Sequence, residues 1–224
     1  PKSKALMNDL IGDQVDLDNM PFYGLAEATV GGRSCVISQS GFSGEAGYEI
    51  YLRDGSQGER LWERIMEAGK PFGLQPGHTS SIRRIEAAML SYHADMNINT
   101  NPFELGLGRL VDLNMEPNFI GKAALRAIQA RGISRVLVGL EIDGLALEGP
   151  NTKHWPLKKN GGQIGHITSA IYSPRLKKNI ALGMVKIAYQ SHGTSLVVES
   201  EMGERSVFVV EKPFYDPAKT IVHT

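Results

Sequence analysis

The sequence is poor in cysteine, in net charge and in long apolar runs. Cys35 is the only cysteine among 224 residues, which excludes an internal disulfide and a cysteine metal cluster. It lies in an expected strand near residues 33–38, where we expect a buried thiol rather than a nucleophile. Lysine plus arginine equals aspartate plus glutamate, 24 of each. A net charge of zero provides no general attraction to nucleic acid or to an anionic membrane, so we expect neither as a partner.

No apolar run approaches the length needed to cross a bilayer, and no signal-peptide pattern is present, so we expect a cytoplasmic location. The hydrophobic share of 42% and the charged share of 21% are ordinary for a globular protein. Residues 1–7 have the pattern of an opening helical turn with proline in its first turn, and they lack an initiator methionine. We therefore expect the sequence to continue a longer chain, and the 224 residues by themselves to be inactive.

The first part of the sequence mixes strand and helix patterns. Strands are expected at 33–40 and 48–53, and the second would place Glu49, Tyr51 and Arg53 on one face. Three helices are expected. The first begins at a capping box of Ser56 and Glu59 and ends near Gly69, the second covers 80–90, and the third covers 122–131.

From residue 135 onward the pattern becomes that of strands separated by turns rich in glycine, proline and asparagine. The expected strands are 135–142, 163–169, 180–187, 195–200 and 206–211. This pattern favours a small antiparallel β-barrel. We therefore predict an α+β chain, with one domain at 1–133 and a C-terminal β-barrel domain at 134–224.

Three segments carry a family resemblance. They are 40–50, with the sequence Ser-Gly-Phe-Ser-Gly-Glu-Ala-Gly-Tyr-Glu-Ile, then 84–125, and then 165–214. Together and in this order they resemble the glycine-cleavage T-protein (aminomethyltransferase) family. The resemblance implies a folate-binding fold followed by a C-terminal antiparallel β-barrel, with residues 1–133 forming an N-terminally incomplete folate-binding domain. It also implies tetrahydrofolate as cofactor.

Within the family, the sequence looks closest to dimethylsulfoniopropionate demethylase. The signals are Trp155-Pro-Leu157 and the Ser-Ala-Ile-Tyr-Ser-Pro run at 169–174. This branch implies methyl transfer from a small sulfonium compound to tetrahydrofolate. One alternative is the aminomethyltransferase of glycine cleavage, which would dock a lipoylated carrier protein. A second alternative is a non-catalytic iron–sulfur assembly protein, but those proteins carry a cysteine motif where residues 119–122 have none.

The resemblance assigns the pterin ring to Glu49. A pterin edge presents a ring N–H beside an exocyclic amine, and a carboxylate accepts from both. By strand periodicity alone, Glu49 would be a solvent-facing residue. Tyr48 is a second candidate for cofactor binding, with packing in the core as its alternative.

Arg84 is the third candidate for cofactor binding, because it matches the second folate-pairing arginine of the family. The first of these arginines is replaced by Ser80. Arg84 could instead form a structural ion pair with Glu86 or Asp95. We expect Asp95 and Glu104 to cap turns or to pair with arginine.

The family's catalytic aspartate corresponds to a position upstream of Pro1, so no residue here is assigned a catalytic role. The six histidines lack the spacing of metal ligands, and no metal site is expected.

Overall fold

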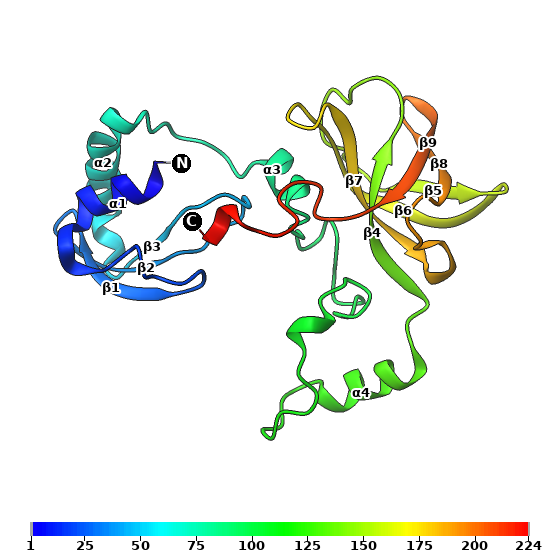
Figure 1. Ribbon diagram of the computed structural model, residues 1–224, viewed down its shortest axis with the longest axis horizontal. Coiled ribbons are helices and arrows are strands. Elements are labelled where there is room, and N and C mark those ends of the chain that lie inside the picture. The colour runs from blue at the N-terminus through cyan, green and yellow to red at the C-terminus, as the bar shows by residue number, and fades with distance from the viewer. Residues whose placement is uncertain (1, 224) are drawn as a thin grey trace. The chain divides into compact units, whose positions relative to one another are not determined.

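The computed structural model describes residues 2–223, and these form two compact units (Figure 1). Unit 1 comprises the chain up to Ser80 together with the residues from Ala218 onward, and unit 2 is Ser81–Pro217. Each unit contains apolar clusters of its own. The domain boundary near residue 133 stays a prediction.

Unit 1 is a three-stranded antiparallel sheet with two helices packed on one face. The strand order is β1-β2-β3, with β1 at Leu25–Val30, β2 at Arg33–Ser38 and β3 at Glu49–Leu52. The helices are α1 at Ser3–Ile11 and α2 at Gly58–Gly69, and both lie on the same side of the sheet in Figure 1. Val30, Cys35 and Ile37 are fully buried between the sheet and the helices.

The opposite face of this sheet is covered by neither α1 nor α2. Because side chains alternate along a strand, the residues facing outward include Glu49 and Tyr51 of β3. In the register of the sheet, Leu25 is opposite Ser38, which is opposite Glu49, and Val36 is opposite Tyr51. A carboxylate therefore shares this face with an aromatic ring and two aliphatic side chains.

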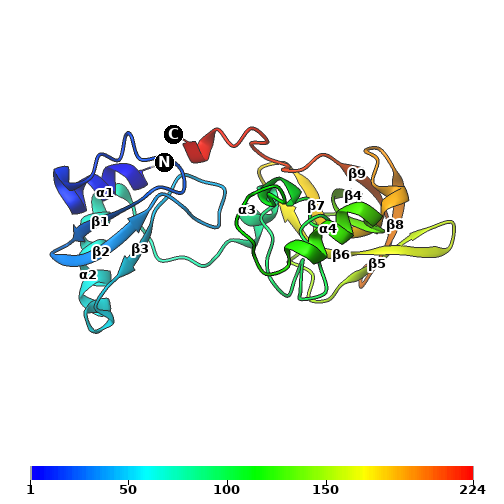
Figure 2. The same cartoon turned by 90° about the horizontal axis from the view of Figure 1, so that it is seen from below.

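Unit 2 contains a closed antiparallel barrel with the strand order β4-β7-β6-β5-β8-β9. The strands are β4 Arg135–Ile142, β5 Trp155–Lys159, β6 Gly162–Ser173, β7 Lys178–Lys186, β8 Ser195–Ser200 and β9 Gly203–Val210. Its interior is filled by aliphatic side chains with Trp155 among them, and Leu140, Leu157 and Ile167 are fully buried. The β5–β6 hairpin extends beyond the rest of the barrel in both views (Figure 1, Figure 2).

Two helices precede the barrel in unit 2, α3 at Ser81–Glu86 and α4 at Lys122–Arg131. Ile85 of α3 packs with Ile171 and Ile180 of the barrel wall. Residues 87–121 connect the two helices without a regular strand or α-helix.

No helix within residues 2–223 is both long and apolar enough to cross a membrane.

The structure confirms the α+β class and the C-terminal barrel, and it corrects two helix boundaries. The helix expected at 80–90 ends at Glu86, because Ala88 adopts φ 52° and closes the helix. The N–H of Met89 donates to Arg84 and that of Ala88 to Ile85, the hydrogen-bond pattern of a Schellman end. The predicted capping box at Ser56 was also wrong. The Asp54 side chain accepts from the Ser56 N–H, and α2 begins at Gly58.

Candidate functional site

Glu49 begins β3 and is exposed on the open face of the unit 1 sheet. Two hydroxyl groups donate to the same carboxylate oxygen, Oε2. Ser40 Oγ lies 2.5 Å from it and Tyr51 Oη lies 2.9 Å from it. Oε1 receives no hydrogen bond from any other residue between 2 and 223. The carboxylate is therefore held at one oxygen and open at the other.

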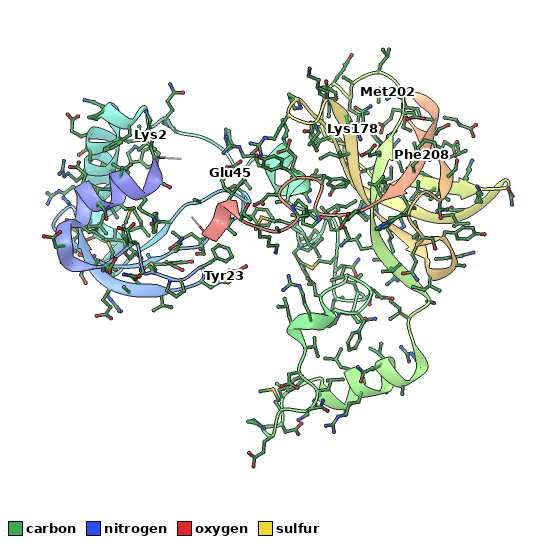
Figure 3. All side chains as sticks on the ribbon, in the orientation of Figure 1. Lys2, Tyr23, Glu45, Lys178, Met202 and Phe208 are labelled. Atoms are coloured by element: carbon green, nitrogen blue, oxygen red, sulfur yellow. The ribbon has the colours of Figure 1, made fainter. Side chains whose placement is uncertain are left out.

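Apolar groups lie beside this carboxylate. Leu25 is 71% exposed and Tyr51 is 55% exposed, both large values for apolar side chains, and Val36 is opposite Tyr51 in the sheet. Tyr23, labelled in Figure 3, comes just before β1 and is also exposed. An open carboxylate oxygen next to apolar surface suits a flat heterocycle that has an N–H edge and apolar faces.

Tyr48 is adjacent to Glu49 in sequence but packs on the other side of the sheet. Its ring is half-buried against the apolar cluster of unit 1, together with Ile50 and Leu52. Burial raises the pKa of the Tyr48 hydroxyl, and the negative charge of Asp18 adds to the shift. Of the two roles considered for Tyr48, core packing is the one this geometry supports.

Arg84 belongs to unit 2, where it is buried in a polar network between α3 and the barrel. Its Nη1 lies 2.6 Å from Asp95 Oδ2, and its Nη2 donates to Ser169 Oγ at 2.8 Å. Thr168 and Ser169 of β6 each donate to Asp95 Oδ1 at 2.6 Å. The guanidinium is thus occupied by protein partners, and the structural ion pair with Asp95 is the arrangement observed. A folate contact by Arg84 stays a prediction.

Glu86 also joins α3 to the barrel, through partners other than Arg84. Ser173 Oγ donates to its carboxylate at 2.5 Å, and Arg175 lies 3.6 Å from the other oxygen. Its backbone carbonyl accepts from the N–H groups of Phe214 and Tyr215. The Arg-Ile-Glu motif at 84–86 therefore fixes α3 on the barrel wall.

Glu104 pairs with an arginine, as expected. Arg135 Nε lies 2.9 Å from Glu104 Oε1, and the Asn101 N–H donates to Oε2 at 3.1 Å. The Glu104 carbonyl accepts from the Leu137 N–H at 2.7 Å. These contacts connect the irregular segment at 87–121 to the first barrel strand.

His154 and His166 stack with ring centroids 4.7 Å apart. Burial lowers the pKa of His166, and the neighbouring His154 and Arg135 lower it further. His166 also lines a cavity of about 350 Å³ with Arg135 and Lys186. Within residues 2–223, no three histidine, cysteine or acidic side chains are grouped to hold a metal ion.

Cys35 is fully buried in β2, as expected, and burial raises the pKa of its thiol. A thiol in this position is shielded from reagents in solvent.

The residues taken as signs of a demethylase lie in the barrel interior and wall. Trp155 and Leu157 are buried core residues of β5. Ser169 and Ser173 donate to Asp95 and Glu86. These positions are accounted for by packing and hydrogen bonding, so they give no information about a methyl donor.

The sequence interpretation missed the polar partners that orient the candidate residues. Strand alternation placed Tyr51 on the same face as Glu49, so the hydrogen bond between them could have been predicted from the sequence. Ser40 gave no such signal, because its distance from Glu49 depends on the path of the turn at 41–48. Thr168 and Ser169 are more than 70 residues from Asp95 in sequence.

Two family descriptions match this chain. The GCVT N-terminal domain matches residues 1–115, and the glycine cleavage T-protein C-terminal barrel domain matches residues 135–216. The chain belongs to the glycine cleavage T-protein family. The barrel domain match covers the closed barrel of unit 2, and the N-terminal domain match includes Glu49 and Arg84.

The curated relatives include aminomethyltransferases. The protein from Synechococcus sp. (strain RCC307) is 37% identical over 96% of this chain and 58% of its own length. The protein from Desulfitobacterium hafniense (strain DSM 10664 / DCB-2) is 41% identical over 82% of this chain and 50% of its own length. The chain thus spans about half the length of these relatives.

The glycine cleavage system aminomethyltransferase T from Bartonella henselae has a similar fold, with a TM-score of 0.76. It is 24% identical, and the match covers 95% of this chain and 57% of that one. These comparisons support the aminomethyltransferase alternative better than the demethylase interpretation.

Proposed function

We propose that the protein transfers a one-carbon unit to tetrahydrofolate as an aminomethyltransferase of the glycine-cleavage type. The observation that carries the proposal is the position of Glu49. Its carboxylate is exposed and open at Oε1, and it shares its sheet face with the exposed side chains of Leu25 and Tyr51. It lies in the part of the chain that matches the family's N-terminal domain.

The residues on the open face of the sheet suit a pterin. The ring N–H and the exocyclic amine of a pterin form one polar edge, and Glu49 offers an acceptor for both. The faces of the ring are apolar, and Leu25, Val36 and Tyr51 provide apolar contact area beside the carboxylate. Bound tetrahydrofolate would supply the nitrogen that accepts the one-carbon unit.

The chemical role proposed for this chain is to hold and orient the acceptor. Alignment of two reactants can supply several kcal/mol of the barrier reduction. An aminomethyl donor also requires an acid near the leaving group, and no residue of this chain is assigned that role. The donor is proposed to be the aminomethyl group of a lipoylated carrier protein, which makes that carrier the partner.

Isothermal titration of the full-length protein with tetrahydrofolate tests the role of Glu49. Glu49→Ala removes charge-assisted hydrogen bonds worth ~1.5–3 kcal/mol, so we expect a loss of affinity of roughly ten- to a hundredfold. Glu27→Ala is the matched control, because Glu27 is an exposed glutamate on the same sheet that pairs with Arg53. Equal affinities for wild type and Glu49→Ala would contradict the proposal.

The donor is tested by a transfer assay. Aminomethylated lipoyl carrier protein should give methylenetetrahydrofolate, and dimethylsulfoniopropionate should give no 5-methyltetrahydrofolate. Formation of 5-methyltetrahydrofolate from the sulfonium compound would establish the demethylase reaction instead.

A further inference from the structure

The carboxylate of Glu49 is held asymmetrically by two hydroxyl groups that come from different parts of unit 1. Tyr51 reaches it from two residues further along β3, on the same face of the sheet. Ser40 reaches it from the segment that follows β2. Both donate to Oε2, so one oxygen is fixed from two directions.

The assignment of the protons follows from the chemistry of the groups. An ionised carboxylate only accepts hydrogen bonds, so the hydroxyl protons of Ser40 and Tyr51 both point toward Glu49. Ser40 Oγ also lies 3.1 Å from Ser38 Oγ, whose own proton is donated to the carbonyl of Gly24. The single proton of Ser40 is assigned to Glu49, because that contact is the shorter of the two, 2.5 Å against 3.1 Å.

This arrangement leaves Oε1 as the oxygen available to a ligand. A carboxylate has about four lone-pair positions, two on each oxygen. Ser40 and Tyr51 use the two on Oε2, and the two on Oε1 remain open. A pterin edge presents two neighbouring N–H donors, which is the number of acceptor positions left.

We infer that Ser40 and Tyr51 are positioning residues, which hold Glu49 through Oε2 so that Oε1 faces the N–H edge of the ligand. The inference rests on the proposed function, because it takes Glu49 as the pterin acceptor. A free glutamate on an exposed strand samples several rotamers, and binding would have to select one of them. The two hydroxyls make that selection before the ligand arrives, which lowers the entropic cost of binding.

Single-atom substitutions test the two hydroxyls. Tyr51→Phe and Ser40→Ala should each weaken tetrahydrofolate binding about two- to tenfold, the range for loss of one hydrogen bond. Ser40→Thr keeps the hydroxyl and should restore most of the affinity. The matched control is Ser34→Ala, which changes an exposed serine of the same unit whose hydroxyl makes no contact with Glu49. This control should bind like wild type.

A double-mutant cycle separates positioning from general damage to the fold. If Tyr51 acts through Glu49, then Tyr51→Phe should change affinity by less than about 1.5-fold in a Glu49→Ala background. A structural role would produce the same fold-change in both backgrounds. That result would overturn the inference while leaving Glu49 as a ligand residue.

The tyrosine titration gives a readout that needs no ligand. The hydrogen bond to Glu49 raises the pKa of Tyr51, and the negative charge of the carboxylate adds to the shift. In Glu49→Gln the pKa of Tyr51 should fall back toward its ordinary value near 10, as followed by NMR of ring-labelled tyrosine. An unchanged Tyr51 pKa would show that Tyr51 does not donate to Glu49 and would overturn the inference.

The outcomes distinguish the inference from the proposed function. Absence of tetrahydrofolate binding by the wild-type protein would overturn the proposed function and, with it, the positioning role. Wild-type binding that is lost in Glu49→Ala but unchanged in both hydroxyl variants would overturn only the inference.

Discussion

Arg84 Nη1 lies 2.6 Å from Asp95 Oδ2, and only 10% of the arginine side chain and none of the aspartate side chain is exposed. The pair connects the last turn of α3 to the segment after it. Through Thr168 and Ser169, the same aspartate is also bound to β6. A buried pair of this kind fixes one arrangement of helix and barrel, because every alternative leaves a charge without a partner.

Asp95→Ala should therefore destabilise unit 2. Removing one partner of a buried pair costs about 3–5 kcal/mol, because Arg84 is left buried without its counter-charge. Urea unfolding followed by Trp155 fluorescence measures the loss, in a Trp62→Phe background so that only the barrel tryptophan reports. Glu141→Ala is the control, because it breaks the more exposed pair with Lys178 and should cost less than about 1 kcal/mol. Similar losses in the two variants would show that Asp95 is not a structural centre.

The stability of the barrel should fall on mild acidification. Burial, His154 and Arg135 hold the pKa of His166 below its ordinary value of 6.5. Between the lowered value and 6.5, the unfolded chain binds the proton and the folded chain does not. The contribution of His166 to the unfolding free energy is therefore fully present above about pH 6.5 and is lost as pH falls below it.

Thermal unfolding of wild type and His166→Gln at about pH 7.5 and about pH 5.5 measures this effect. The variant should lose less stability between the two pH values, because it lacks the titrating group. His192→Gln, which replaces an exposed histidine before β8, should keep the wild-type pH dependence. An identical pH dependence in wild type and His166→Gln would contradict the prediction.

In the β5–β6 hairpin, substitution of Gly161 by alanine should lower the stability of the protein, and the same substitution of Gly162 should not. Asn160 and Gly161 form its turn with φ values of 51° and 78°, the left-handed conformations of a type I′ turn. Gly161→Ala should cost about 1–2 kcal/mol, because a Cβ is disfavoured in this conformation. At Gly162, φ is not positive and an added Cβ would lie 3.7 Å from the nearest atom outside its chain neighbours, so Gly162→Ala should be nearly neutral. Chemical unfolding of both variants makes the comparison, and a larger cost at Gly162 would refute it.

The outer face of β3 was predictable from the sequence, and the details of the site were not. The alternation along 48–53 placed Glu49 and Tyr51 together, because side-chain direction in a strand depends only on residue parity. The approach of Ser40 to Glu49 depends on the path of the intervening turn. For the same reason, the sequence left two roles open for Tyr48, and only the packing of its ring against Ile50 and Leu52 favours the core.

The second predicted helix shows the limit of periodicity. Ile82 and Ile85 have helical spacing and lie in α3, with Ile85 buried. The pattern continues to Met89, but the chain turns at Ala88, a residue with high helix propensity. Packing of Ala88 against the cluster of Leu105, Leu137 and Leu182 accompanies this turn. A favourable tertiary contact can outweigh a local preference of less than about 1 kcal/mol.

By itself, the sequence determined local elements such as α4 and the strands at 135–142 and 195–200. These follow from interactions between residues a few positions apart. Only the tertiary structure decided that β4 pairs with β7 and β9, which closes the barrel. It also decided that Arg84 pairs with Asp95 while Glu86 binds Ser173. These pairings depend on which surfaces are buried against each other. A buried charge pairs with the group that the packed elements place within hydrogen-bonding distance.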